Sequence, residues 1–299
     1  MRCLCAAANV PGACGVTRVA IATCAGLPDL DPDDRALPPA LAALGIDAAI
    51  VAWDDPSADW DAFDLVAVRN TWDYPDRRDA FLAWARRVPR IVNPAEVLAW
   101  TTDKRYLVEL EAAGLPVVHT TFVETSGGSL DVGPDGVVVK PAVGVGSVDA
   151  GRHRDPASAR AHVAELLAQG RPAMVQPFLP GIAERGETAL IVLAGTFSHA
   201  IHKGPMLPET GIVRPYGLFQ PENISAREPT AAELAVGERV TAWLTERFGP
   251  LAYARIDVVP GPDGDPVVLE CELAEPSLFL ATSPGAPVRL AHALADKIC

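Results

Sequence analysis

LAYARIDVVPGPDGDPVVLECELAEPSLF, residues 251–279, is the stretch that decides the fold. Its two halves, Tyr253–Val259 and Pro266–Cys271, are rich in Val, Ile and Leu. The Pro- and Gly-rich run at 260–264 between them predicts a turn. We therefore expect two strands that pair antiparallel and that carry charged residues in an otherwise apolar hairpin.

The charged residues of this hairpin predict a metal site. Because side chains alternate along a strand, Arg255 and Asp257 share one face, and Glu270 and Glu272 share a face of the partner strand about 7 Å apart. Acids in an apolar context are costly unless something neutralises them, and a hard divalent cation with oxygen ligands would do so. We expect Mg²⁺ at Asp257, Glu270 and Glu272, with Mn²⁺ as the alternative metal. The structural alternative pairs Arg255 with Asp257 or Glu270 and leaves the other acids in solvent.

Composition sets the class of protein. The 299 residues are 49% hydrophobic, which is ample for a packed core, and the length predicts two or three sub-domains. A net charge of −13 argues against sequence-independent binding of nucleic acid, which needs a basic surface. No apolar run approaches the roughly 20 residues that span a bilayer, and residues 1–8 are too short for a secretory signal. We expect a cytoplasmic protein without nucleic-acid or membrane partners. The oligomeric state stays open, with a homo-oligomer among the alternatives.

The six cysteines do not suggest a disulfide framework or a zinc site. They stand at positions 3, 5, 14, 24, 271 and 299, without a C-x-x-C pair. Cys271 lies between two glutamates of the expected hairpin, so its side chain should point away from them into the core.

Strands and helices alternate along the rest of the chain. Residues 1–16 lack a periodic pattern and are expected to form a loose tail. An α/β domain is expected over 17–93, with strands at 18–24, 48–53, 65–69 and 90–93 and helices at 38–44 and 77–88. Beyond it we expect strands at 117–124, 136–141, 173–176, 188–193 and 197–202, and helices at 104–113, 156–169, 230–248 and 286–298.

The loop RNTWDYP, residues 69–75, is a candidate substrate site. It follows the third expected strand, and in open α/β sheets ligands lie outside the carboxyl ends of the strands. Arg69 suits a carboxylate or a planar urea-like group, Asp73 suits an ammonium, and Asn70 and Tyr74 add hydrogen-bonding groups. The structural alternative is that Trp72 and Tyr74 close the sheet edge.

Two lysines stand where a phosphate could bind. Lys104 lies in the first turn of an expected helix, where a cation opposes the helix dipole. Lys140 ends an apolar strand and is followed at once by AVGVGSVDAG, residues 142–151. The backbone N–H groups near Gly144 and Gly146 and the Ser147 hydroxyl can close on phosphate oxygens. The loop matches neither standard glycine-rich phosphate motif, so a simple turn is the alternative.

Further candidates follow the next strand. PFLPG, residues 177–181, predicts a hinge in which backbone groups of Phe178 and Leu179 are free to bond a flat heterocycle. Residues 204–228 form an irregular stretch that is long enough to suggest a function, with a solvated linker as the alternative. The remaining candidate side chains are Glu184, Glu187, His202, Lys203 and Arg214.

This order of features resembles the ATP-grasp superfamily, whose enzymes hold Mg-ATP between two α+β lobes. The resemblance covers residues 93–299, and residues 18–92 are similar to the pre-grasp domain that precedes them. TDKR at 102–105 and AGLPV at 113–117 are similar to a segment of D-alanine:D-alanine ligases. The resemblance implies an α/β and α+β fold with a first lobe at 94–185, which includes a small central lobe at about 115–180, and a C-terminal metal-binding lobe at 186–299.

The resemblance also implies a role for each candidate. Lys104 and Lys140 become phosphate ligands, and Gly144, Gly146 and Ser147 part of a mobile loop over the triphosphate. Phe178 and Leu179 become adenine contacts, Glu187 the ribose ligand with Glu184 as a second candidate, and Asp257, Glu270 and Glu272 metal ligands. Arg255 and Lys203 become the cations at the transferred phosphoryl group. The superfamily commonly has asparagine where Glu272 stands, which adds a negative charge here.

The superfamily transfers the γ-phosphoryl group of ATP to a carboxylate and lets a nucleophile attack the acyl phosphate. The loop at 69–74 and the ECELAEPSLF ending at 270–279 are most similar to the D-cycloserine-forming branch, which implies cyclisation of O-ureido-D-serine through its own nitrogen. The alternatives are an intermolecular carboxylate–amine ligase of the glutathione synthetase-like type, an ATP phosphotransferase and a non-catalytic ATP-binding protein. The glycine loop and residues 204–228 are the expected lids.

Overall fold

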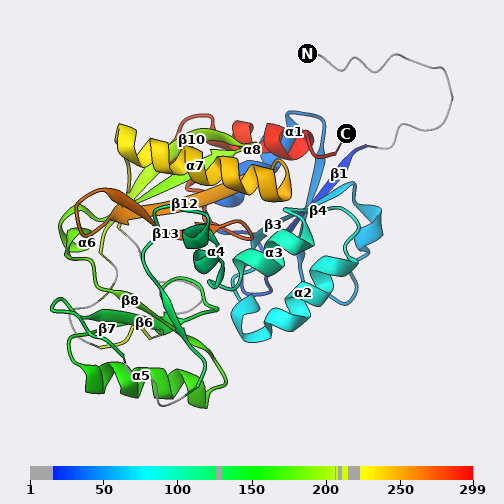
Figure 1. Ribbon diagram of the computed structural model, residues 1–299. Helices are drawn as coiled ribbons and strands as arrows, with labels where there is room; N and C mark the ends of the chain where they lie inside the picture. Colours follow the sequence, from blue (N-terminus) through cyan, green and yellow to red (C-terminus); the bar gives the residue numbers. More distant parts are fainter. Residues whose placement is uncertain (1–15, 126–129, 206, 208–210, 215–222, 299) are drawn as a thin grey trace.

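The computed structural model describes residues 16–125, 130–205, 207, 211–214 and 223–298. The expected tail, apart from residue 16, and Cys3, Cys5, Cys14 and Cys299 therefore lie outside the described residues. Those described form three sheets with helices packed against them (Figure 1). None of the helices among these residues is long and apolar enough to cross a membrane.

The first sheet is parallel, with strand order β2-β1-β3-β4. Its elements are β1 (Arg18–Thr23), α1 (Leu37–Ala42), β2 (Asp47–Ala52), β3 (Leu65–Asn70), α2 (Arg78–Arg87) and β4 (Ile91–Val92). All six residues of β3 are buried, as expected for a strand in the middle of a covered parallel sheet. Every strand and helix expected in this region is present, with ends that differ by a few residues.

The second sheet is a small antiparallel sheet of order β5-β8-β6-β7, with one helix against it. It comprises β5 (Thr121–Val123), β6 (Val137–Pro141), β7 (Gly151–His153), α5 (Pro156–Ala168) and β8 (Ala173–Pro177). Asp155 caps α5 by accepting hydrogen bonds from two backbone N–H groups of its first turn. Strand β7 was not expected, because the glycine loop leads directly into it.

The third sheet contains the charged hairpin. Its order is β11-β10-β9-β12-β13, built from β9 (Glu187–Leu193), β10 (Thr196–Lys203), β11 (Ile224–Ala226), β12 (Tyr253–Pro260) and β13 (Pro266–Glu272). Strands β12 and β13 pair antiparallel, with Arg255 opposite Glu272 and Asp257 opposite Glu270. The hairpin and the shared face of its charged residues are therefore confirmed.

Alternation along β9 explains how two helices cover the two faces of this sheet. Leu190 and Val192 pack in one core with α7 (Ala231–Phe248), whereas Ile191 and Leu193 pack in another with α8 (Ala286–Ala295). Helix α7 begins with a capping box between Thr230 and Glu233. Both helices lie within the expected ranges.

The helix expected at 104–113 begins later than predicted. Residues 95–101 form a helix of their own, α3 (Ala95–Thr101), and the Thr102 N–H bonds to the Leu98 carbonyl at its end. The next helix, α4 (Tyr106–Ala112), starts after a turn that contains Lys104. Lys104 therefore precedes the helix and does not lie in its first turn.

The hinge expected at residues 177–181 also differs from the structure, because α6 (Pro180–Arg185) follows Leu179 directly. Short 3-10 helices occupy Asp34–Ala36, Trp60–Ala62, Tyr74–Arg77 and Leu280–Thr282.

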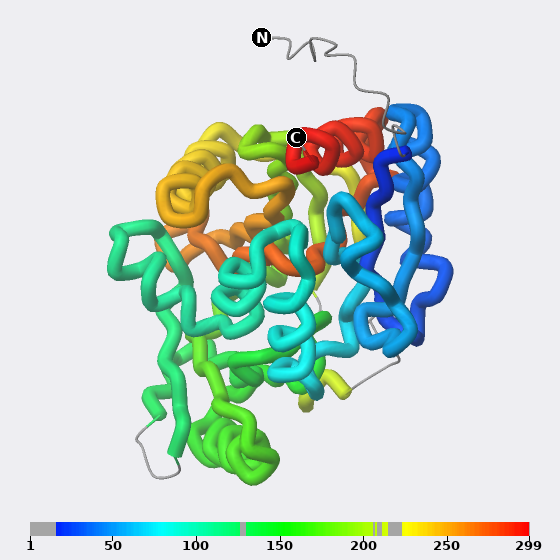
Figure 2. Tube along the Cα trace, turned by 90° about the vertical axis from the view of Figure 1, so that its right-hand side faces the viewer, coloured from blue at the N-terminus to red at the C-terminus, as the bar shows by residue number. Residues whose placement is uncertain are grey.

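The first sheet shares a core with the C-terminal part of the chain. Residues of β1 and α1 pack in one cluster with residues of β9, β12 and α8, and Figure 2 shows the red C-terminal helix beside the blue N-terminal segment. Asn93 donates hydrogen bonds to the carbonyls of Tyr253 and Leu273 and accepts one from the Ala252 N–H. The Tyr253 hydroxyl lies 2.7 Å from the Val68 carbonyl. These bonds fix the first sheet against the charged hairpin.

A buried ion pair also crosses this boundary. Arg69, which is fully buried, pairs with Asp34 through Nε and Nη2 and donates from Nη2 to the Pro276 carbonyl at 2.8 Å. Asn70 donates to the same Asp34 carboxylate at 2.8 Å. Arg69 thus ties β3 to the loop that follows β13.

Breaking this pair should destabilise the protein. We expect Arg69→Ala and Asp34→Ala each to lower the free energy of unfolding by about 3–5 kcal/mol, because either change leaves a buried charge without its partner. The measurement is the urea midpoint of unfolding. Arg77→Ala is the control, because the Arg77 side chain is 44% exposed and its ion pair with Asp54 should contribute less than about 1 kcal/mol. An Arg69→Ala midpoint equal to that of the control would contradict the prediction.

Candidate active site

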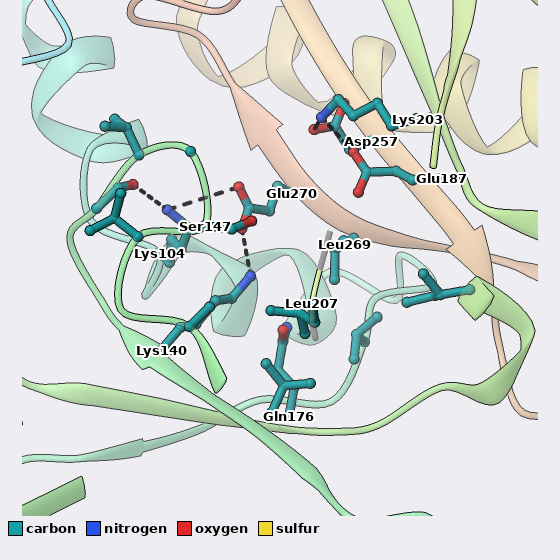
Figure 3. A pocket seen from close by; sticks show the side chains of 18 of the residues that line it. Lys104, Lys140, Ser147, Gln176, Glu187, Lys203, Leu207, Asp257, Leu269 and Glu270 are labelled. Carbon is teal, nitrogen blue, oxygen red and sulfur yellow. Dashed lines mark hydrogen bonds and ion pairs between the residues drawn. The ribbon is translucent and has the colours of Figure 1, made fainter. Parts of the chain in front are cut away.

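A cavity of about 370 Å³ lies between the second and third sheets and reaches the first sheet at Trp72. The chain has only four lysines, and three of them, Lys104, Lys140 and Lys203, line this cavity. Four carboxylates face them, as the close view in Figure 3 shows for Glu187, Asp257 and Glu270; the fourth is Glu272. The cavity therefore concentrates the cations and acids that the sequence singled out.

Glu270 holds the two lysines expected to bind phosphate. Lys140 Nζ lies 2.6 Å from Glu270 Oε1, and Lys104 Nζ lies 3.9 Å from Oε2 (Figure 3). Burial alone would raise the pKa of Glu270, but the two lysines lower it to about 2. Since Lys140 comes from β6 and Glu270 from β13, this ion pair joins the second sheet to the third.

Asp257 is the centre of a second group of charges. It accepts hydrogen bonds from Arg255, at 2.9 Å from Nε, and from Lys203, at 3.0 Å from Nζ. Burial opposes ionisation, but these two cations hold the pKa of Asp257 well below its usual range. Lys203 also bonds to Glu187 at 2.6 Å, and Arg255 bonds to Glu272. Burial raises the pKa of Glu187 to about 7 and also raises the pKa of Glu272.

The acids can serve as ligands for a hard divalent cation, because they are carboxylates on facing strands of one hairpin. Within the described ranges, however, no three acidic, histidine or cysteine side chains surround one point as a preformed metal site. Lysine and arginine side chains lie between them and neutralise them. Metal binding at Asp257, Glu270 and Glu272 therefore requires these cations to move to another partner.

The glycine loop lies over the same cavity, with Gly144, Gly146 and Ser147 in its lining. Lys104 Nζ donates to the Gly144 carbonyl at 2.8 Å, and Lys104 N–H donates to the Ala142 carbonyl. Gly146 and Ser147 both have positive φ, 58° and 57°. Backbone N–H groups of such a turn can form a concavity suited to an anion.

The far end of the cavity is apolar and fits a flat ring. Val118, Val138, Leu179, Ile182 and Leu269 line it. One detail differs from the expectation, because the Phe178 N–H is already bonded to the Gly136 carbonyl at 3.0 Å and is not free for a heterocycle.

The two candidate ribose ligands, Glu187 and Glu184, lie in different environments. Glu187 lines the cavity, whereas Glu184 is an exposed residue of α6 outside the lining. The geometry therefore favours Glu187, the first of the two candidates.

The four substrate candidates at 69–74 lie outside the cavity lining. Arg69 and Asn70 are buried against Asp34, and Asp73 accepts a hydrogen bond from Trp53 Nε1 at 2.8 Å. Tyr74 stacks on Phe81 with ring centroids 5.0 Å apart. Arg69, Asn70 and Asp73 thus use polar groups for bonds within the protein, and Arg69 also bonds to the Pro276 carbonyl. Contact of these four residues with the substrate stays a prediction. Trp72 is the residue of this loop that reaches the cavity.

The other two substrate candidates also lie elsewhere. His202 is half-buried outside the lining, with Nε2 3.2 Å from the Arg185 carbonyl. Arg214 pairs with Asp149 of the glycine loop and with Glu165 of α5. Next to it, Val213 exchanges backbone hydrogen bonds with Asp149 and Ala150, so residues 212–213 pair with the end of the glycine loop, whereas β11 of the same stretch pairs with β10.

The sequence interpretation missed several residues of the lining. They are Trp72, Arg152, Gln176, Glu275 and Ser277. Arg152 lies over the Phe178 ring, 3.3 Å from its centroid, and comes from the unexpected strand β7. Glu275 had a signal in the sequence, as a third acid two residues beyond the apolar Leu273 of the ECELAEP segment.

The three sheets and a charged cavity between two lobes are the arrangement of the ATP-grasp ligases. The crystal structure of a D-alanine–D-alanine ligase from Bacillus anthracis complexed with ATP matches 94% of this chain and 97% of that chain with a TM-score of 0.63. At 12% identity this likeness shows the fold alone. The fold class expected from the sequence is thus confirmed.

Closer relatives define the family. A family model described as the N-terminal domain of D-cycloserine synthetase DcsG matches residues 19–93. The cycloserine biosynthesis protein DcsG of Streptomyces lavendulae is 38% identical over 289 residues, which cover 89% of this chain and 95% of that protein. The crystal structure of D-cycloserine synthetase DcsG matches 94% of this chain and all of that chain with a TM-score of 0.82 and 35% identity. The chain belongs to the DcsG family of ATP-grasp enzymes and is an ATP-dependent ligase.

Lys140 should contribute to nucleotide binding. We expect Lys140→Met to weaken the binding of a non-hydrolysable ATP analogue by about 1.5–3 kcal/mol, the contribution of a charge-assisted hydrogen bond. The measurement is calorimetry in the presence of Mg²⁺. Lys297→Met is the matched control, because Lys297 is the one lysine outside the cavity lining. Equal affinities of the two variants would make Lys140 a counter-ion of Glu270 only.

Glu270 should be needed for turnover. We expect Glu270→Gln to lower ATP consumption by about 100-fold or more, since a neutral amide would replace a carboxylate that is expected to bind the metal. The same change should lower the unfolding midpoint, because Lys104 and Lys140 lose their counter-charge. ADP release and urea unfolding measure the two effects. Glu246→Gln, on the exposed face of α7, is the control, and a variant with wild-type turnover would remove Glu270 from the site.

Proposed function

We propose that this enzyme closes O-ureido-D-serine to D-cycloserine at the expense of ATP. The observation that carries the proposal is the 38% identity over nearly the whole chain to a cycloserine biosynthesis protein. The cavity itself supports the coarser activity, an ATP-dependent ligase. The match to a structure described as D-cycloserine synthetase, with a TM-score of 0.82, supports the same substrate.

In the proposed reaction, the substrate carboxylate receives the γ-phosphoryl group of ATP. The nitrogen of the ureido group bonded to oxygen then attacks this acyl phosphate and closes the five-membered ring. Phosphate leaves, and the carbamoyl group departs as carbon dioxide and ammonia. The balance is O-ureido-D-serine, ATP and water giving D-cycloserine, ADP, phosphate, carbon dioxide and ammonia. Water must be kept from the acyl phosphate, because its attack would return the starting carboxylate.

In this proposal the residues of the cavity divide into those that hold the nucleotide, those that hold the metal and those that stabilise the transferred phosphoryl group. Lys104, Lys140 and the loop with Gly144, Gly146 and Ser147 would hold the phosphates. Phe178 and Leu179 would face the adenine, without the Phe178 N–H, which is bonded to Gly136, and Glu187 would face the ribose. Asp257, Glu270 and Glu272 would hold Mg²⁺, which supplies positive charge at the transferred phosphoryl group. Arg255 and Lys203 would stabilise the charge that develops there.

The ion pairs of the cavity support this assignment. Glu187, Asp257, Glu270 and Glu272 are balanced by Lys104, Lys140, Lys203 and Arg255, four acids by four cations. ATP would bring about four negative charges, and two divalent ions would bring four positive ones. The lysines could then move to phosphate and the carboxylates to metal without a change in the net charge of the cavity. Internal ion pairs are thereby replaced by pairs with the ligand.

The product decides between this reaction and its alternatives. We expect the enzyme with Mg²⁺, ATP and O-ureido-D-serine to release one ADP for each D-cycloserine, with the mass of the substrate reduced by that of carbon dioxide plus ammonia. The L-enantiomer is the control substrate. A stable phosphorylated substrate would indicate a phosphotransferase, and turnover only with a second amine would indicate an intermolecular ligase. Removing divalent metal with a chelator should stop ADP release, and added Mg²⁺ should restore it.

A further inference from the structure

Glu275 is a buried acid of the cavity for which the roles above have no use. It lies in the loop after β13, is 6% exposed and lines the cavity. Its Oε2 atom has no hydrogen-bond partner among the described residues. An unpaired carboxyl oxygen away from water is costly, and such a group facing a cavity is therefore a candidate to bind a ligand.

The loop holds Glu275 in a fixed position. Trp72 Nε1 donates to the Glu275 carbonyl at 2.9 Å, and Arg69 donates to the carbonyl of the next residue, Pro276, at 2.8 Å. The Tyr74 side chain is a neighbour of the Glu275 carboxyl. The first sheet therefore holds the backbone on both sides of Glu275, and the side chain at the cavity lining keeps a carboxyl oxygen without a partner.

The charges around Glu275 define what it can bind. The other four acids of the lining each have an ion pair with lysine or arginine. No ion pair with Glu275 is present in the described part of the chain, although Glu272, Lys104 and Arg255 are its charged neighbours. When ATP occupies the lysines, Glu275 still lacks a cation. A positively charged group of the substrate could then supply the cation partner that Glu275 lacks.

We propose that Glu275 binds the α-ammonium group of an amino-acid substrate and so selects α-amino acids over the corresponding deaminated carboxylic acids. This inference rests on the proposed function, because it takes the substrate carboxylate to be the one phosphorylated near Arg255 and Asp257. The residues assigned to the nucleotide, with Phe178 and Leu179 at the adenine, do not include Glu275. In this proposal Glu275 therefore binds the substrate and has no role in holding ATP.

The test compares two substrates on two enzymes. One substrate is O-ureido-D-serine, and the other is the same molecule with hydrogen in place of the α-amino group. We expect Glu275→Gln to lower kcat/KM for O-ureido-D-serine by about 10- to 100-fold, since it loses a charge-assisted contact. For the deaminated compound the two enzymes should agree within about threefold. The preference of the wild-type enzyme for the amino compound should then largely disappear in the variant.

Three further measurements separate binding from a structural role. The affinity of Glu275→Gln for a non-hydrolysable ATP analogue should equal that of the wild type. Its unfolding midpoint should be equal or higher, because the variant removes a buried, unpaired acid. Glu275→Asp should recover part of the preference for the amino compound, because it restores the charge. Glu246→Gln is the control and should behave as wild type with both substrates.

The outcomes distinguish this inference from the proposed function. An enzyme that does not consume O-ureido-D-serine contradicts the proposed function and the inference that depends on it. An enzyme that consumes it, but whose Glu275→Gln variant loses the same factor with both substrates, contradicts the inference alone. Such a result would mean that Glu275 takes a proton from the attacking nitrogen or supports the loop.

Discussion

Buried charge must be compensated, and in this protein the compensation is made between sheets. Glu270 of the third sheet is neutralised by Lys104 and by Lys140 of the second sheet, which lies 130 residues away in the sequence. Either charge alone in the cavity would cost several kcal/mol, so the lobes stay together in the form that keeps the pair intact. Because the same groups are suited to phosphate and metal, nucleotide binding competes with the contacts that hold the empty site.

The first sheet supports this arrangement from the other side. Asn93 and Tyr253 join it to β12, and Arg69 joins it to the loop after β13. That loop carries Glu275 into the cavity. Arg69 and Trp72 both donate hydrogen bonds to backbone carbonyls of this loop. The same bonds therefore satisfy buried donors of the first domain and position the substrate end of the site.

Much of the fold followed from local patterns. The alternation of Arg255, Asp257 and their partners, the Pro- and Gly-rich turn at 260–264 and the apolar strand before Lys140 all depend on neighbouring residues, and the structure confirms these strands. Errors arose where local signals are ambiguous. A helix was expected from residue 104, but α3 ends at Thr101 and the next helix begins only at Tyr106. The prolines at 177 and 180 suggested a hinge where α6 begins.

The sequence by itself determined that the site would combine acids with cations suited to phosphate. The alternation of side chains along the hairpin strands places the acids on one face, and Lys140 stands directly before the glycine loop. Only the tertiary structure decided which polar side chains meet the cavity. Arg69 and Trp72 are three residues apart. Arg69 bonds to Asp34 and to a carbonyl 207 residues away, whereas Trp72 lines the cavity. The physical reason is range: alternation along a strand is set by adjacent residues, but the partner of a buried charge is set by the packing of elements that are distant in the chain.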